Sequence, residues 1–288
     1  MKNVVLIDAD SLAFMGKPTD SIQDIILKVD EKINNILDIC QANYYCLFVS
    51  QGKYFRHDLK DKSEESGSYK SNRKYSNQNY NRVIKEYLIA QYGAVSSPNV
   101  EADDVIAYWI NKTIMWATNL DGIPFLFDSR SLILTEDTEK CNIILSAVDK
   151  DLLKSIPGRH LVYNKKQGDE WGMEWVETSL DDSLNFKAMQ MLHGDSSDGI
   201  SGLGGIGPKR AEKILEQWTD ASIEAFILEV YINYYKNSAT AIYEFQKNYR
   251  LLHLLDCDED FMREVGYVPT LPNFKEVTKQ NIEIKNEF

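Results

Sequence analysis

The sequence predicts an α/β protein in which a parallel sheet is followed by a helical region. In the first part of the chain, short and fully apolar runs of strand length alternate with patterns of helical spacing. Strands with continuous apolar runs are typical of parallel sheets that helices cover on both faces. From 184 onward, the helical spacing recurs without such runs. We therefore expect an α/β core over 1–183 and a helical region over 184–288.

The elements of the α/β core are predicted one by one from their patterns. VVLI, YYCLFVS and NIILSAV are apolar runs of strand length, and LVY is a shorter candidate. Apolar residues at helical spacing separate them, and Pro98 marks a further helix start. The expected order is strand 4–7, helix 20–41, strand 44–50, helix 80–91, a helix after Pro98, strand 142–148 and strand 161–163.

Two stretches lack a clear period and are expected to be irregular. They are residues 117–141 and the polar residues after 256. In the helical region, LNFKAMQMLH at 184–193 repeats its apolar residues at helical spacing. A second helix is expected from Pro208, because proline suits the first turn of a helix.

The stretch HGDSSDGISGLGGIGPKRAEKI at 193–214 joins these two helices. Gly202, Gly204 and Gly207 satisfy the G-x-G-x-x-G pattern, but a dinucleotide-binding loop requires a preceding strand. Pro208 follows the last glycine, so the Gly-Lys-Ser/Thr of a P-loop is absent. Two interpretations stay open: a helix N-terminus that binds phosphate, and a plain corner between helices with solvated cations.

The composition is that of an ordinary globular protein, with 43% hydrophobic and 26% charged residues. No apolar stretch approaches the length of a membrane span, and Asp8 and Asp10 interrupt any signal-peptide core. We therefore expect a cytoplasmic protein. The four cysteines form no metal-binding pairs and are expected to be reduced thiols. The four histidines do not cluster in sequence, so zinc is not expected.

The net charge of −12 argues against nucleic acid as a partner, but the charge is unevenly distributed. Residues 53–85 carry nine Lys or Arg against four acids, a local excess of five, and five aromatic residues lie among them. Cations with interleaved rings are typical of channels that bind single strands. Taken alone, the same segment is better explained as a polar surface loop.

Nine carboxylates stand in four clusters: two after apolar strands, one at the helix after Pro98 and one before the glycine turn. Each cluster alone is better explained by turn or helix-cap chemistry. Carboxylates brought together, however, repel one another unless cations neutralise them, and hard oxygen donors favour Mg²⁺ or Mn²⁺. The nine are Asp8, Asp10, Glu101, Asp103, Asp104, Asp149, Asp151, Asp195 and Asp198.

The order of these motifs resembles the 5′-nuclease family, which includes phage and bacterial flap endonucleases and the 5′-nuclease domain of bacterial DNA polymerase I. LIDAD is similar to the family's first strand, and GKYFRHDL followed by YKSNR to its arch segment. VEADDVIA, SAVDKDLL and GDSSDGISGLGGIGPKRAEKIL match the three later motifs. The resemblance implies a PIN-like α/β nuclease core with a helical arch at about 51–90, and a helix-three-turn-helix for DNA binding at about 184–218.

The resemblance also implies roles for individual residues. The first metal ion would be held by Asp8, Glu101, Asp103 and Asp104, and the second by Asp149, Asp151, Asp195 and Asp198. The catalytic cations would be Lys70 and Arg73. The DNA contacts would be Lys53, Arg56, Tyr69, Gly205, Gly207, Lys209 and Arg210. A potassium ion would be bound by the main-chain carbonyls of Ser201, Leu203 and Ile206.

The activity implied by the resemblance is that of a 5′→3′ exonuclease and flap endonuclease with two Mg²⁺ ions, for which Mn²⁺ can substitute. Branched or 5′-flapped DNA would be its substrate, with RNA–DNA hybrids as a second class and replication proteins as further partners. We expect a monomer that does not bind membranes, located in the host cytoplasm if the phage-like form reflects a phage origin.

Two features depart from the family's pattern. Gln51 stands where the family has an aspartate before the arch glycine, and Asp10 is a candidate to compensate for it. Residues 117–141 are longer than the usual link. Three alternatives follow: a DNA-binding protein whose catalysis is weak or lost because of Gln51, a dinucleotide-dependent enzyme, and a related metal-dependent ribonuclease. The second requires a strand before Gly202, and the turn at 194–214 argues against the third.

Overall fold

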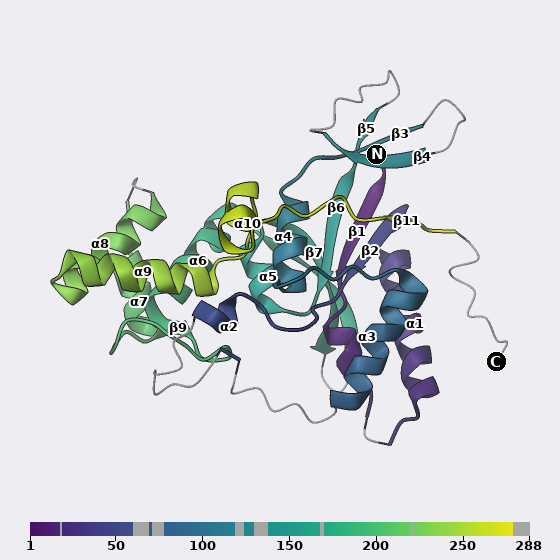
Figure 1. Cartoon of the computed structure of the whole chain (residues 1–288), viewed down its shortest axis with the longest axis horizontal. Coiled ribbons are helices and arrows are strands. Elements are labelled where there is room, and N and C mark those ends of the chain that lie inside the picture. Colours follow the sequence, from purple (N-terminus) through teal and green to yellow (C-terminus); the bar gives the residue numbers. More distant parts are fainter. Residues whose placement is uncertain are drawn as a thin grey trace.

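The computed structural model describes residues 1–278 except 18, 60–68, 71–77, 119–123, 130–137, 168–169 and 220–221. Figure 1 shows a central sheet with helices on both faces, a helical region beside it and a small second sheet near the N-terminus. The α/β core followed by a helical region is the architecture that the sequence predicts.

The central sheet has six strands in the order β11-β2-β1-β6-β7-β8. Its four inner strands run parallel: β2 (Tyr44–Phe48), β1 (Asn3–Asp8), β6 (Asn142–Ala147) and β7 (Gly158–Gln167). These are the four predicted strands, and β7 is longer than expected. The outer strands β8 (Glu170–Thr178) and β11 (Lys275–Glu276) are antiparallel to their neighbours, so the sheet is mixed at both edges.

Alternate residues of β1 point into two separate cores. Val4 and Leu6 pack beneath α4 (Ala102–Ile110) and α10 (Asp258–Glu264). Val5 and Ile7 pack on the other face, beneath α1 (Ile22–Ile39) and α3 (Gln78–Tyr92). Burial on both faces explains why this strand reads as a continuous apolar run. The helices that the sequence predicts at 20–41, at 80–91 and after Pro98 are confirmed as α1, α3 and α4.

The helical region is built from α6 (Leu180–His193), α7 (Pro208–Leu215), α8 (Ile223–Tyr235) and α9 (Ser238–Leu252). These helices share a third core, whose largest fully buried side chain is Tyr231. A short antiparallel pair, β9 (Gly194–Asp195) and β10 (Ile200–Ser201), lies between α6 and α7. The helices expected at 184–193 and from Pro208 are confirmed, and Pro208 is the first residue of α7.

Three expectations about secondary structure were wrong, two about irregular segments and one about the helical region. Within 117–141, the structure forms part of a three-stranded antiparallel sheet made of β3 (Ile114–Thr118), β4 (Pro124–Asp128) and β5 (Glu139–Lys140). After 256 it forms α10 and β11, and β11 pairs with β2, so the chain returns from the helical region to the core. The region from 184 is also not wholly helical. These strands are two to five residues long, too short to show a period in the sequence.

The remaining elements are a 3₁₀ turn (Ser11–Phe14), α2 (Arg56–Leu59) and α5 (Lys150–Ser155). Among the described helices, none is both long enough and apolar enough to cross a membrane. All four cysteines are free thiols, and three of them are buried. Burial raises the pKa of the Cys40 thiol to about 12, so this thiol is neutral and inert.

Candidate metal centre and nucleic-acid interface

The sheet topology places the ends of two acid-bearing strands side by side. β1 and β6 are parallel neighbours, with Ile7 opposite Ser146. Asp8 therefore ends β1 next to the point where β6 ends, and Asp149 follows two residues later as the N-cap of α5. In open α/β sheets this edge is where ligands bind.

Asp8 and Asp103 are neighbouring acids at this edge of the sheet, and Asp103 lines a cleft of carboxylates. Asp8 is 2% exposed, and burial followed by the charges of Asp10 and Asp149 raises its pKa to about 8. Burial and the charges of Asp8 and Asp149 also raise the pKa of Asp103, which stands in the first turn of α4. Acids that are buried and close together resist ionisation until a cation neutralises them.

Glu101 is the N-cap of α4 and lines the same cleft. Two cations, Arg56 and Lys70, pair with its carboxylate. Its carboxylate accepts hydrogen bonds from Tyr69 Oη at 2.8 Å, Arg56 Nη1 at 3.3 Å and Lys70 Nζ. Burial opposes its ionisation, but Lys70 and Arg56 hold the pKa of Glu101 below its usual value. Glu101 is thus an ionised carboxylate at the cleft wall.

Four further acids come from α5 and from the β9–β10 turn. Asp149 Oδ1 accepts from the Asp151 amide at 2.7 Å, which caps α5. Burial and the charge of Asp149 raise the pKa of Asp151 to about 7. Asp198 accepts from Tyr69 Oη at 3.2 Å. Lys70 Nζ lies 3.9 Å from Asp198 and is also paired with Glu101, so one ammonium links the two sides of the cleft.

Asp195 is the most heavily hydrogen-bonded carboxylate of the cleft. Oδ1 accepts from the amide and hydroxyl of Ser197, and Oδ2 accepts from Lys150 Nζ at 2.9 Å and from Gln190 Nε2 at 3.2 Å. Although burial opposes ionisation, the bonds from Ser197 and Lys150 lower the pKa of Asp195 to about 2. Sequence patterns gave no signal for Gln190, because a single glutamine within a helix belongs to no motif.

Apart from Asp8, these carboxylates line one cleft, and the charge of Asp8 acts on Asp103 in its wall. Among the described residues that line it, there is no cysteine or histidine. Hard carboxylate oxygens of this kind fit Mg²⁺ or Mn²⁺. The predicted residues that the structure brings together here are Glu101, Asp103, Asp149, Asp151, Asp195, Asp198, Arg56, Tyr69 and Lys70.

Asp104 and Arg56 lie differently from the roles that the resemblance implied. Asp104 is fully buried, and its two oxygens accept from Arg56 at 2.6 and 2.8 Å and from the Leu255 amide at 3.0 Å. Arg56 is 2% exposed and also donates to the carbonyls of Leu251 and His253. Arg56 is therefore buried, and Asp104 is not among the described residues that line the cleft. Together the two side chains join α2, α4 and the end of α9.

Gln51 and Asp10 both lie at the edge of the site. Gln51 follows β2, is exposed, and accepts from Ser96 Oγ at 3.3 Å. Asp10 Oδ1 is held by Lys85 Nζ at 2.7 Å and by the Ser50 amide at 2.9 Å. The charge of Asp10 is therefore matched by a lysine, although it remains close enough to contribute to the raised pKa of Asp8.

The glycines of the turn allow the chain to reverse and its backbone to pack closely against the end of α6. A side chain on Gly202 would place its Cβ 2.3 Å from the carbonyl carbon of His193, so the turn packs directly on the end of α6. Gly205 has a φ of +73°, a conformation that favours glycine. The carbonyls of Ser201 and Leu203, two of the expected potassium ligands, already accept from Asn248 Nδ2 and the Ile206 amide.

The cations predicted to bind substrate differ in their exposure and in whether they are paired with an acid. Lys209 and Arg210 are exposed in the first turn of α7, where Gly207 is the N-cap. Cations at that end oppose the helix dipole, which a bound phosphate would relieve. Lys53 is exposed and paired with Asp58. Arg73 lies outside the described residues.

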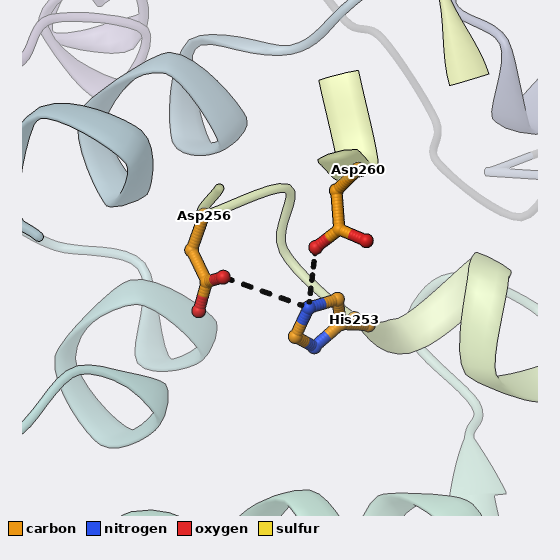
Figure 2. A group of neighbouring side chains, drawn as sticks. All are labelled: His253, Asp256 and Asp260. Carbon is orange, nitrogen blue, oxygen red and sulfur yellow. Dashed lines mark hydrogen bonds and ion pairs between the residues drawn. The ribbon is translucent and has the colours of Figure 1, made fainter. Parts of the chain in front are cut away.

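A second group of titratable side chains lies where α9 meets α10. Figure 2 shows Asp256 and Asp260 facing the ring of His253, whose Nε2 is 3.9 Å and 3.2 Å from their oxygens. Arg263 also pairs with Asp260 at 2.7 Å, so a guanidinium neutralises part of the group. Because the His253 carbonyl accepts from Arg56 at 2.6 Å, this group fixes the chain segment that holds the Arg56–Asp104 pair.

The sequence is similar to bacterial DNA polymerases I. That of Caldicellulosiruptor bescii is 31% identical over 175 residues, which cover 59% of this chain and 18% of the polymerase. That of Thermus aquaticus is 27% identical over 188 residues, which cover 63% of this chain and 18% of the polymerase. The chain thus corresponds to less than a fifth of the length of these relatives. No protein-family model matches the sequence.

Solved structures with this fold include proteins of bacteriophage T5. Its flap endonuclease, in a pseudo-enzyme-product complex with DNA and metal ions, gives a TM-score of 0.56 at 16% identity, covering 88% of this chain and 90% of that one. The chain has the fold of a 5′-nuclease. A T5 5′-exonuclease with bound zinc gives a TM-score of 0.53 at 18% identity, with 88% and 90% coverage. The resemblance to the 5′-nuclease family that the motifs predicted is confirmed.

The helix before the glycine turn removes the dinucleotide alternative. A dinucleotide-binding loop would need a strand of a parallel sheet, within a βαβ unit, to lead into Gly202. The strand that does lead into it, β10, is two residues long and pairs antiparallel with β9 after α6 has ended at His193. The turn therefore joins helices, as expected from Pro208.

Proposed function

We propose that this protein is a divalent-metal-dependent 5′ nuclease that hydrolyses phosphodiesters at 5′ ends or 5′ flaps of branched duplex DNA. The observation that carries the proposal is the convergence of six carboxylates from α4, α5 and the β9–β10 turn on one cleft beside Lys70. Its fold matches that of a flap endonuclease whose structure contains DNA and metal ions.

The donor set fits a pair of divalent cations. Glu101, Asp103 and Asp8 would hold one, and the acids of α5 and the β9–β10 turn, among them Asp151 and Asp195, would hold the other. Two such ions supply the positive charge that stabilises attacking and leaving oxygens in phosphodiester cleavage. We propose Mg²⁺ as the natural ion, with Mn²⁺ able to substitute and K⁺ as a third ion at the turn.

The chain's own residues would position the substrate around this cleft. Lys70 is 12% exposed and lies between Glu101 and Asp198, so its ammonium is at the place where a phosphate would approach the acids. Tyr69 holds Glu101 and Asp198 with one hydroxyl and so fixes the cleft walls. Lys209 and Arg210 at the start of α7 would bind the duplex backbone, which predicts strong salt dependence of binding.

We extend the proposal to the setting of the reaction. The substrates are branched or 5′-flapped DNA and RNA–DNA hybrids met in DNA replication and primer removal, and the protein acts as a monomer in the cytoplasm, that of the host if phage-encoded.

Cleavage of a labelled 5′-flap duplex tests the proposal directly. The protein is assayed with Mg²⁺ and with EDTA, beside the double variant Asp149→Asn plus Asp151→Asn. We expect cutting near the junction that requires Mg²⁺ and is abolished in the variant. The matched control, Asp38→Asn plus Asp181→Asn, removes two exposed acids outside the cleft and should cut normally.

Gln51 favours a second candidate function, that of a structure-specific DNA-binding protein with weak or lost catalysis. Its exposed amide brings no charge to the first half of the cleft. Tight, salt-sensitive binding of the flap duplex without cutting in Mg²⁺ or Mn²⁺ would support this candidate. Cleavage gained in Gln51→Asp would then identify the missing carboxylate as the cause.

A further inference from the structure

Gln190 connects two acids of the cleft through one side-chain amide. It lies on α6 and is 5% exposed. Its Nε2 lies 2.9 Å from Asp151 Oδ1 and 3.2 Å from Asp195 Oδ2. An amide nitrogen carries two N–H groups, so each carboxylate can accept one. Both donors of this group are thus directed at two like charges.

The two acids belong to different parts of the fold. Asp151 stands in the first turn of α5, which follows the central sheet, whereas Asp195 lies in β9, which follows α6. Their spacing therefore depends on how the α/β core meets the helical region. Gln190 is on α6, the first helix of the helical region, five residues before Asp195, and its amide donates to Asp151 of the α/β core.

Lys150 of the α/β core also donates to Asp195, and its side chain differs from that of Gln190 in two ways. Its Nζ lies 2.9 Å from Asp195 Oδ2, but its side chain is 51% exposed and carries a charge. Asp195 already accepts four donors, so a metal ion bound by Asp195 must displace one of them. The exposed lysine can turn into solvent, while the buried amide cannot.

We propose that Gln190 is a positioning residue of the second metal site, spacing Asp151 and Asp195 so that one divalent cation fits between them. The inference rests on the proposed function, since it assumes that these acids bind metal. A neutral donor suits the task because it orients two carboxylates without cancelling the charge that attracts the ion. A lysine there would compete with the metal, and a glutamate would repel its neighbours.

Titration of the DNA-free protein with Mn²⁺, followed by calorimetry, measures metal binding without cleavage. In Gln190→Met, which keeps the side-chain length and removes both donors, one of two ions should bind about 10- to 100-fold more weakly. The other ion should bind as in the unaltered protein. Lys150→Met should instead bind Mn²⁺ more tightly. Gln217→Met, which alters an exposed glutamine on the far side of the glycine turn, is the matched control and should change neither ion.

Flap cleavage adds a second readout. The Mg²⁺ concentration for half-maximal cutting should rise about tenfold or more in Gln190→Met, and excess Mg²⁺ should restore the maximal rate. A purely structural role would lower the rate without such rescue. If Gln190→Met does not fold, judged by its melting transition, the nearly isosteric Gln190→Glu replaces it and should weaken the same ion.

The outcomes separate this inference from the proposal on which it rests. Unaltered protein that takes up no Mn²⁺ contradicts both. Unaltered protein that binds two ions, together with a folded Gln190→Met or Gln190→Glu of the same affinities, overturns the role of Gln190 alone and leaves the nuclease proposal standing.

Discussion

Asp8 and Asp103, in one half of the carboxylate cleft, differ in the stability of their negative charge from Asp195 in the other half. In the half at the end of β1 and the start of α4, burial and mutual repulsion raise the pKa values of Asp8 and Asp103. In the half at the β9–β10 turn, hydrogen bonds to Asp195 lower its pKa to about 2 although it is also buried. The same residue type is thus destabilised as an anion in one half and stabilised in the other.

This difference separates two ways of preparing a site for metal. In the first half, Asp8 and Asp103 are costly to ionise, so a cation beside them relieves repulsion within the fold. The second half uses Ser197, Lys150 and Gln190 to orient an acid that is already charged. Removal of the charge of Asp8 or Asp103 should therefore raise stability and lower activity, whereas removal of the charge of Asp195 should lower both.

The largest expected effect is that of Asp103→Asn compared with Asp195→Asn. Both should reduce Mg²⁺-dependent cleavage by about 100- to 1000-fold, because each removes charge that holds a catalytic ion. In EDTA, Asp103→Asn should raise the melting temperature, whereas Asp195→Asn should lower it. Cleavage and thermal unfolding of the two variants measure this contrast. If both variants were stabilised, or both destabilised, the difference between the halves would be refuted.

Removal of one partner of the buried Arg56–Asp104 pair should lower the stability of the fold. Arg56→Ala leaves Asp104 buried and unpaired, which should lower the free energy of unfolding by about 3–5 kcal/mol. Denaturant titration measures it, with Arg82→Ala, whose side chain is 79% exposed, as the control with an effect near zero. A normal unfolding free energy combined with weaker DNA binding would restore Arg56 to the DNA-contacting role that the family resemblance implied.

The raised pKa values predict how the stability of the metal-free protein depends on pH. An acid with a higher pKa in the folded state binds more protons folded than unfolded, so stability falls as pH rises from its unfolded pKa of about 4 to its folded pKa. For Asp8 this window runs to about pH 8. Unfolding in EDTA from pH 4 to 8 should show this loss, and Mg²⁺ should reduce it. A free energy of unfolding that rises steadily from pH 4 to 8 would contradict the unfavourable ionisation of Asp8 in the folded protein.

The smallest of these effects concerns the glycine turn, outside both halves. Lys209→Ala plus Arg210→Ala should weaken flap-duplex binding and lower the slope of log affinity against log salt by about two, one for each lost phosphate contact. The melting temperature should not change, because both side chains are exposed. Lys140→Ala on the small second sheet is the control. An unchanged salt slope would favour the plain corner between helices over a phosphate-binding turn.

The sequence predicted the parts of the site that are determined locally. Apolar runs that end in Asp8 and Asp149 predicted two parallel strands, and parallel neighbours bring such ends together. Pro208 predicted the start of α7. Each of these inferences depends on residues within a few positions of one another, where periodicity and turn chemistry are informative.

The parts that the sequence did not predict depend on distant contacts. Arg56 finds Asp104 and the carbonyls of Leu251 and His253, which lie up to 197 residues away. A basic residue in a basic segment gives no sign that it will be buried. Gln190 likewise acquires its role only when α5 and β9 meet across it. The strands β3, β4 and β5 were missed because they are short and pair only with one another.

The most direct test of the central claim is an anomalous difference map from crystals of the protein soaked in Mn²⁺. We expect one peak among Asp8, Glu101 and Asp103 and a second beside Asp151 and Asp195. Peaks absent from the cleft, or confined to the His253 group between α9 and α10, would contradict the claim that these carboxylates form the metal centre of a nuclease.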